Sequence, residues 1–404
     1  MSNWQGQPDV YDGAFWDWVE SKSAKDLPAL RLKYGRQEPY FTAIAQVHAR
    51  TALAKKFPTL VRNRWLFPSG VSLEQSSSEP LAKFKAQLLE GLLVEAGLTA
   101  VHTVDLTGGM GMDSWAFSCL PQVGRQVLIE PQHTLVQLYA HNLPGAEVFE
   151  TTAEHFLEGG ALDQWLTAAA VPSEEVLFFV DPDRRAKGVK VAQLKDAQPN
   201  LLSLQPHLLN RGRWVLSKHS PMASIEELRE LECLKALWVV QWRGENKEIL
   251  ALQEAHFFGE ATMTAVELEP FFKTTGPVSL PAAKRGTSTC KTYLIQPGPA
   301  LIKSGLHALW AEQFGWTKLL AGMLYTADQA PASNALYKMF EVIAVGRPYK
   351  IDLPILELAI ESIGFPDSAE QVRKRLKAKE GRTWKLFALG YGSTKEMILC
   401  RLME

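Results

Sequence analysis

Several features are scarce in this sequence of 404 residues, and each absence narrows the class of protein. No apolar run approaches the roughly 18 residues that a membrane-spanning helix needs, and the first residues lack the basic start and apolar segment of a secretion signal. Four widely spaced cysteines without a CxxC pair predict reduced thiols in a cytosolic protein. The nine histidines show no metal-ligand spacing, so we expect no metal.

Neither sign of charge dominates the chain, since 43 Lys and Arg stand against 44 Asp and Glu. Any nucleic-acid-binding surface must therefore be a local patch. Two patches are present: residues 25–64 hold nine basic and two acidic residues, and residues 371–385 hold seven basic and one acidic. A single run of basic residues is more often a solvated helix face than a binding surface. The expectation of RNA contact therefore depends on the presence of two separate patches.

What the chain does contain is the composition of a soluble globular protein, with 46% apolar and 22% charged residues. Four regions differ in pattern: a helical region at 1–97, a region at 98–243 in which strands alternate with helices, a small α/β (ferredoxin-like) unit at 244–300, and an α+β unit at 301–404. The alternation predicts a parallel sheet covered on both faces. Its strands are expected at 101–106, 127–130, 146–149, 176–180 and 214–216, with helices at 114–120, 134–142 and 193–209. In the last unit we expect helices at 302–314, 355–363 and 369–379 and a strand at 384–389.

The strongest chemical signal is the segment VDLTGGMGMDSW at 104–115, which follows a predicted strand and opens a predicted helix. Asp105 ends that strand, and Gly108, Gly109 and Gly111 let the backbone approach a ligand without a Cβ in the way. Glu130 ends the next strand, where an acid holds the two hydroxyls of a ribose. The sequence therefore predicts a nucleoside-binding site; the alternative is a tight turn with a surface glutamate.

The segment DLTGGMG resembles the first motif of class I S-adenosylmethionine (SAM)-dependent methyltransferases, D/E-x-G-x-G-x-G, with Thr107 in place of the first glycine. The longer pattern D-x-T-x-G-x-G-x-D is similar to the motif of bacterial 16S rRNA guanine-N2 methyltransferases. The resemblance implies a Rossmann-like fold, SAM as cofactor, and a binding site composed of Asp105, Thr107, Gly108, Gly109, Gly111, Asp113, Glu130, Thr152, Ala153, Asp181 and Pro182. NAD is disfavoured because Asp113 would repel its pyrophosphate.

A second motif, VLFFVDPDRRAKG at 176–188, brings Asp181 to the same sheet edge. We expect Asp181 to orient or deprotonate the accepting group, with Arg184 as a second catalytic residue and Arg185 on a phosphate; an ordinary polar loop is the alternative. D-P-x-R is similar to D-P-P-R of RNA C5-uracil methyltransferases, but the segment WVLSKHSP lacks their cysteine, and N-P-P-Y is missing. The accepting atom therefore stays open.

The whole chain resembles bacterial class I methyltransferases that carry a THUMP-like domain at the C-terminus. The motifs are DLTGGMG, DPDRR, LEQSSSEPLAKFKA and the final YKI…KRLKAKEGRTWKLFALG. In the third, Ser76 to Ser78 with Lys83 could fold over the cofactor or cap a helix. THUMP domains bind RNA, which implies RNA contacts for Arg373, Lys374, Lys377, Arg382 and Lys385, with Trp384 or Phe387 available to stack on a base.

The sequence thus predicts a cytoplasmic SAM-dependent enzyme that methylates a base of structured RNA, either rRNA or tRNA. Two alternatives stay open. One is a methyltransferase acting on a small molecule or a protein, and the other is a non-catalytic RNA-binding protein that retains the SAM fold. The oligomeric state is not predicted.

Overall fold

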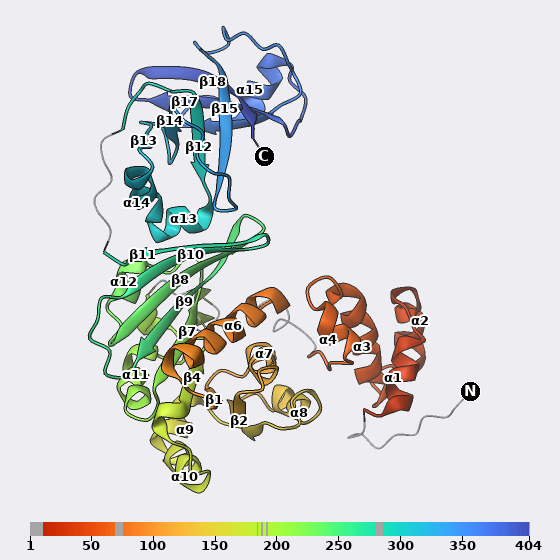
Figure 1. The fold of residues 1–404 in the computed structure, drawn as a ribbon. Coiled ribbons are helices and arrows are strands. Elements are labelled where there is room, and N and C mark those ends of the chain that lie inside the picture. Colours follow the sequence, from red (N-terminus) through yellow and green to blue (C-terminus); the bar gives the residue numbers. More distant parts are fainter. Residues whose placement is uncertain are drawn as a thin grey trace. The chain divides into compact units, whose positions relative to one another are not determined.

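The computed structural model describes residues 11–68, 76–183, 185–186, 189–190, 193–279 and 286–403. The chain divides into two compact units, the first comprising Met1–Ser217 with Gln253–His256 and the second Lys218–Leu252 with Phe257–Glu404. Figure 1 labels the helices and strands of both.

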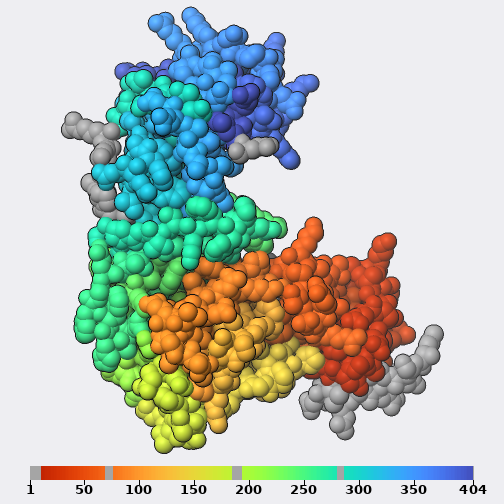
Figure 2. Space-filling model, in the orientation of Figure 1, coloured from red at the N-terminus to blue at the C-terminus, as the bar shows by residue number. Residues whose placement is uncertain are grey.

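The first unit begins with helices α1 (Gly13–Glu20), α2 (Leu27–Tyr34), α3 (Tyr40–Leu53) and α4 (Pro58–Arg62). Asp12 caps α1 by accepting a hydrogen bond from the Phe15 amide at 2.9 Å. Apolar side chains of α1, α2 and α3 form one core cluster that includes Phe15, Trp16 and Ile44. In Figure 2 this region, in red and orange, lies against the yellow residues of the sheet domain, which agrees with a paired hydrogen bond between the Asn142 side chain and the Leu66 backbone.

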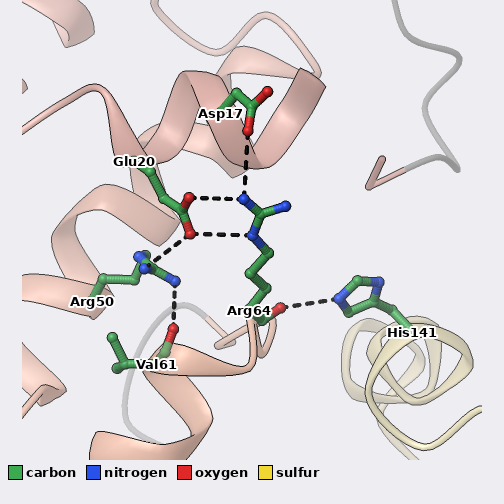
Figure 3. A network of polar contacts seen from close by, with 6 residues as sticks. All are labelled: Asp17, Glu20, Arg50, Val61, Arg64 and His141. Atoms are coloured by element: carbon green, nitrogen blue, oxygen red, sulfur yellow. Dashed lines mark hydrogen bonds and ion pairs between the residues drawn. The ribbon is translucent and has the colours of Figure 1, made fainter. Parts of the chain in front are cut away.

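Part of the first basic patch stabilises this helical region itself (Figure 3). The Arg64 guanidinium pairs with Glu20 at 2.9 Å and with Asp17 at 3.4 Å. Arg50 pairs with Glu20 at 3.2 Å and donates to the Val61 carbonyl at 2.7 Å. Basic side chains that stay exposed in this region are Lys25, Arg31, Lys33, Arg36, Lys55 and Arg62.

Five parallel strands of the first unit lie in the order β3–β2–β1–β4–β7. Their bounds are β1 Val101–Asp105, β2 Val123–Ile129, β3 Glu147–Phe149, β4 Val176–Val180 and β7 Trp214–His219. The remaining helices are α6 Glu79–Ala96, α7 Met112–Ser118, α8 His133–Asn142, α9 Ala153–Glu158, α10 Ala161–Ala168 and α11 Leu201–Leu209, and a short pair of strands is β5 Arg185–Ala186 and β6 Val189–Lys190. The predicted parallel sheet is confirmed, and β1, β2 and β4 end at one edge because they run in the same direction.

The second unit contains α12 Ile225–Arg229, β8 Leu234–Trp242, β9 Glu245–Glu254, β10 Thr262–Leu268 and β11 Phe271–Pro277. Its C-terminal part is a seven-stranded sheet in the order β13–β14–β12–β15–β18–β17–β16. Those strands are β12 Tyr293–Pro297, β13 Thr317–Lys318, β14 Tyr325–Ala327, β15 Tyr337–Gly346, β16 Ala359–Ile363, β17 Trp384–Tyr391 and β18 Thr394–Leu402, accompanied by α13 Pro299–Ser304, α14 Leu306–Gln313 and α15 Ala369–Leu376.

Three expected helices differ from the structure. The expected helix at 302–314 is divided between α13 and α14, because Gly305 has φ of 78° and ends α13. Residues 359–363 form β16, which pairs in parallel with β17, because the apolar residues of this stretch fit a strand as well as a helix and the neighbouring strand supplies the hydrogen bonds. In the expected helix at 193–209 only α11 is a regular α-helix. It starts at Leu201, where Asn200 accepts from the Leu202 amide, while Gln198 is held extended by two backbone hydrogen bonds to Asp183.

Two of the three expected domain boundaries lie between secondary-structure elements, and the third lies inside a helix. The boundary at 97–98 follows α6, whose C-cap is Gly97 with φ of 66°, and the boundary at 243–244 lies in the turn between β8 and β9. The boundary at 300–301 falls inside α13. The division into four domains stays a prediction.

Candidate cofactor-binding site

The turn after β1 is organised around the buried carboxylate of Asp105, whose residue is 2% exposed. Oδ1 accepts from the Thr107 amide at 3.0 Å, and Oδ2 accepts from the Ser114 hydroxyl at 2.7 Å. Since Ser114 belongs to α7, these bonds join the strand, the turn and the following helix. The Asp105 carboxylate therefore fixes the conformation of the turn through these two hydrogen bonds.

Glu130 follows β2 and is bound to the same turn. Its carboxylate accepts from the Gly109 amide at 2.8 Å and from the Gln132 amide at 2.9 Å. Glu130 is buried, so the alternative of a surface glutamate is wrong. The Tyr139 hydroxyl donates to the Gly109 carbonyl at 2.7 Å from α8, and burial, followed by the charges of Glu130 and Asp105, raises the pKa of this hydroxyl and keeps it a neutral donor.

The glycines of the turn are required for different reasons. Gly109 and Gly111 have φ of 54° and 79°, a region that other residues rarely adopt. Gly108 is constrained by packing, because a Cβ there would come within 2.6 Å of the Tyr139 hydroxyl. At Gly109 a Cβ would meet the Thr107 carbonyl oxygen at 3.6 Å, an ordinary van der Waals contact, so the positive φ rather than packing favours glycine there.

The site is rich in negative charge. Burial raises the pKa of Asp105 to about 7, with a smaller contribution from the charges of Asp113 and Asp181, while hydrogen bonds from Ser114 and Thr107 act in the opposite direction. Burial also raises the pKa of Glu130. A positively charged ligand would relieve the repulsion among these carboxylates.

Thr107 connects the two motifs of the sheet edge. Its hydroxyl accepts from the Asp181 amide at 2.7 Å and lies 3.4 Å from Asp105 Oδ1. A glycine at this position, as in the motif that the turn resembles, could make neither contact. The hydroxyl thus holds the backbone after β4 against the turn after β1.

We expect Thr107→Val to speed amide hydrogen exchange at Asp181 and to lower the free energy of unfolding by about 1 kcal/mol, since a partly buried N–H loses its acceptor. Thr107→Ser, which keeps the hydroxyl, serves as the matched control and should resemble the wild type. Exchange measured by mass spectrometry on a peptide spanning Asp181 checks this. Equal exchange in the valine and serine variants would show that the hydroxyl does not hold this segment.

The other sequence-predicted residues are placed unevenly. Asp181 is half-buried and Pro182 is buried at the end of β4. Thr152 is exposed, and its hydroxyl caps α9 by accepting from the His155 amide at 3.3 Å, while Ala153 is buried in that helix. Arg184 lies outside the described residues, and of Arg185 only the backbone, in β5, is described.

A buried polar cluster beside the turn was missed by the sequence analysis. Lys85 of α6 is fully buried and pairs with Asp113 of α7 at 3.1 Å. Ser77 joins them, since its hydroxyl accepts from Lys85 at 3.2 Å and donates to Asp113 at 3.1 Å. Lys83, the lysine singled out from the sequence, instead pairs with Glu79. The apolar neighbours of Lys85 at Leu81, Phe84 and Leu89 were the available signal.

This cluster weakens one argument made from the sequence. Asp113 was expected to repel an anionic pyrophosphate, but the ammonium group of Lys85 neutralises it. The preference for a cationic ligand over NAD therefore depends on Asp105, Asp181 and Glu130.

The C-terminal basic patch is largely paired within its own unit. Arg373 pairs with Glu380, Lys374 with Glu370 at 3.2 Å, and Lys385 with Glu361 at 2.5 Å. Lys377, Lys379 and Arg382 are exposed. Phe387 is completely buried in the sheet core, so it cannot stack on a base as expected.

Three further observations concern cysteines, metal ligands and membrane-spanning helices. All four cysteines are free thiols. Within the described ranges, no group of three or more His, Cys, Asp or Glu side chains is arranged to hold a metal ion. None of the helices in that part of the chain is both long and apolar enough to cross a membrane.

Comparison with known proteins identifies the fold. No protein-family model matches the chain, and a search of curated proteins finds no match. Among solved structures, one from Porphyromonas gingivalis W83, described as a "putative methyltransferase", matches with a TM-score of 0.78 and 23% identity over 98% of this chain and 100% of that chain. Two weaker matches have TM-scores of 0.28, too low to support a fold assignment. One is described as a "putative methyltransferase" from Escherichia coli, with 16% identity over 43% of this chain and 86% of that chain. The other is described as a "putative RNA methyltransferase" from Pyrococcus horikoshii, with 12% identity over 42% of this chain and 84% of that chain. At this level of identity the first match shows the fold alone, and that fold is the Rossmann-like fold of class I methyltransferases.

Proposed function

We propose that this chain is a SAM-dependent methyltransferase whose acceptor is a base in structured RNA. The observation that carries the proposal is the turn after β1, where the Gly109 amide donates to the buried carboxylate of Glu130 at the end of the next strand. The fold supports it, since open parallel sheets bind ligands at the carboxyl ends of their strands.

The residues at this edge fit the chemistry of SAM. Glu130 can accept hydrogen bonds from two ribose hydroxyls, because each of its oxygens keeps a further lone pair beside its backbone donor. The negative charge of Asp181, and that of Asp105 once it ionises near its raised pKa of about 7, favours a cation over a pyrophosphate, and SAM carries a sulfonium. When bound, SAM supplies a methyl group to a nucleophilic acceptor.

We assign to Asp181 the role of contacting the group that accepts the methyl. It follows β4 directly, and Thr107 holds its backbone amide at the edge where the turn lies. A carboxylate in this place can accept a proton or a hydrogen bond from the accepting group. The acceptor atom itself stays open.

RNA is the proposed substrate because exposed cations occur in two separate places along the chain. In the helical region they include Arg31, Lys33 and Arg62, and near α15 they are Lys377, Lys379 and Arg382. Cations of this kind neutralise phosphates. We propose that the C-terminal unit acts as a THUMP-like RNA-binding domain and that the enzyme works in the cytoplasm.

Methyl transfer from tritiated SAM to total RNA from a strain lacking the gene tests the proposal. We expect label in RNA, with transfer abolished by Asp181→Asn even at SAM concentrations that saturate the variant. Lys377→Ala with Arg382→Ala should weaken RNA binding. Lys395→Ala, which changes an exposed lysine of β18 outside the patch, should not. Label in protein or in small molecules would favour the second substrate class, and SAM binding without transfer would indicate a non-catalytic protein.

A further inference from the structure

Trp65, which follows α4, reaches the glycine turn. The residue is 4% exposed, and its indole Nε1 has no hydrogen-bond partner in the described part of the chain. The ring atom Cζ2 would lie 3.7 Å from a Cβ at Gly111. Cζ2 is two bonds from Nε1, so the N–H lies close to the ring atom that approaches the turn. A buried donor without an acceptor is costly and needs an explanation.

Ser78, at the start of α6, presents a second orphan group. It is the N-cap residue of α6, a position where a serine hydroxyl normally accepts from the first turn, yet it makes no such bond. The side chain is 4% exposed, and its Oγ has no partner among the described residues. Helix capping therefore does not account for this serine. Its neighbour Ser77 is bonded to Asp113 of α7, which brings the start of α6 to the start of α7.

Hydrogen bonds through Leu60 connect the segment that carries Trp65 to the segment that carries Ser78. Glu79, adjacent to Ser78, accepts from the amides of Thr59 and Leu60 at 2.6 and 3.1 Å and so caps α4. The Trp65 amide donates to the Leu60 carbonyl at 3.0 Å. The start of α4 and the start of α6 are thus held together by Glu79. Trp65 follows α4 and Ser78 precedes α6, and each carries one polar group without a partner in the described part of the chain.

We propose that Trp65 and Ser78 bind the carboxylate of the amino-acid end of the cofactor. This inference rests on the proposed function. A carboxylate accepts from an indole N–H and from a hydroxyl at once, which satisfies both orphan groups. The nearest acid in α7, Asp113, does not oppose the anion because Lys85 neutralises it. The helical region before the sheet thereby completes the cofactor site.

Two ligands separate this contact from the rest of the site. S-adenosylhomocysteine carries the amino-acid carboxylate, and 5′-methylthioadenosine lacks it. By calorimetry on the full chain, we expect Trp65→Phe and Ser78→Ala each to weaken S-adenosylhomocysteine binding about tenfold and to change methylthioadenosine binding less than twofold. Trp214→Phe is the matched control. Trp214 is also buried, and its Nε1 has no partner among the residues that the structure describes, but it starts β7, whereas the turn follows the end of β1.

Each outcome has a distinct meaning. If the wild type binds neither ligand, the proposed function falls, and this inference with it. If the wild type binds both and the two variants keep their affinity for S-adenosylhomocysteine, only this inference is overturned. Equal weakening of both ligands would likewise overturn it, since that would indicate a structural role. Should Trp65→Phe fail to fold, Ser78→Ala decides alone.

Discussion

Asp105→Asn is expected to raise the free energy of unfolding at pH 8 by up to about 4 kcal/mol. The wild-type carboxylate is buried, and its pKa in the folded protein lies at about 7 against 3.8 for an ordinary aspartate. Asparagine keeps the acceptor for the Thr107 amide and places no charge in the core.

The dependence on pH gives the prediction its sign. Because the pKa is raised on folding, the folded state holds the Asp105 proton between about pH 4 and pH 7 while the unfolded state has lost it. This contribution to stability is therefore complete below about pH 4 and is lost as the pH rises through 7. The difference between variant and wild type should be small at pH 4 and reach its full size above pH 7.

Denaturant unfolding of both proteins across this pH range provides the measurement. The wild type at low pH is the internal control, since its Asp105 is then neutral as well. A variant that is less stable than the wild type at pH 8 would contradict the burial argument. The same substitution should weaken SAM binding, because it removes the negative charge that favours the sulfonium, so stability and affinity are expected to change in opposite directions.

Lys85→Met should destabilise the first unit by about 3–5 kcal/mol, because it leaves the Asp113 carboxylate buried without its cation. Ser77 would retain only its bond to Asp113. Thermal and denaturant unfolding measure the loss.

Adding Asp113→Asn provides the control for Lys85→Met. The double variant removes both charges and keeps an acceptor for the Ser77 hydroxyl, so most of the lost stability should return. A double variant as unstable as the single one would show that Lys85 acts through its aliphatic packing rather than its charge. A matched exposed pair, Lys374 with Glu370, should change stability by less than about 1 kcal/mol when broken.

The central sheet was predictable because its signals are local. Each strand is a short apolar run of residues. The glycines of the turn have positive φ or lack room for a Cβ, and these requirements are visible in the sequence because they select glycine. The stretch at 355–363 was not predictable, since its apolar spacing suits either element and the hydrogen bonds of β17 decided between them. Phe387 illustrates the same limit, because an aromatic beside a basic run can face the solvent or the core.

The sequence alone determined the alternation of strands and helices, the glycine turn after Asp105 and the position of Glu130 at the end of the next strand, because these depend on residues adjacent in the chain. Only the tertiary structure brought Lys85 and Ser77 to Asp113, placed the Thr107 hydroxyl on the Asp181 amide, and set Trp65 beside the turn. The reason is physical: these contacts join residues up to 74 positions apart, and their partners are chosen by which buried polar groups the packing leaves to be satisfied.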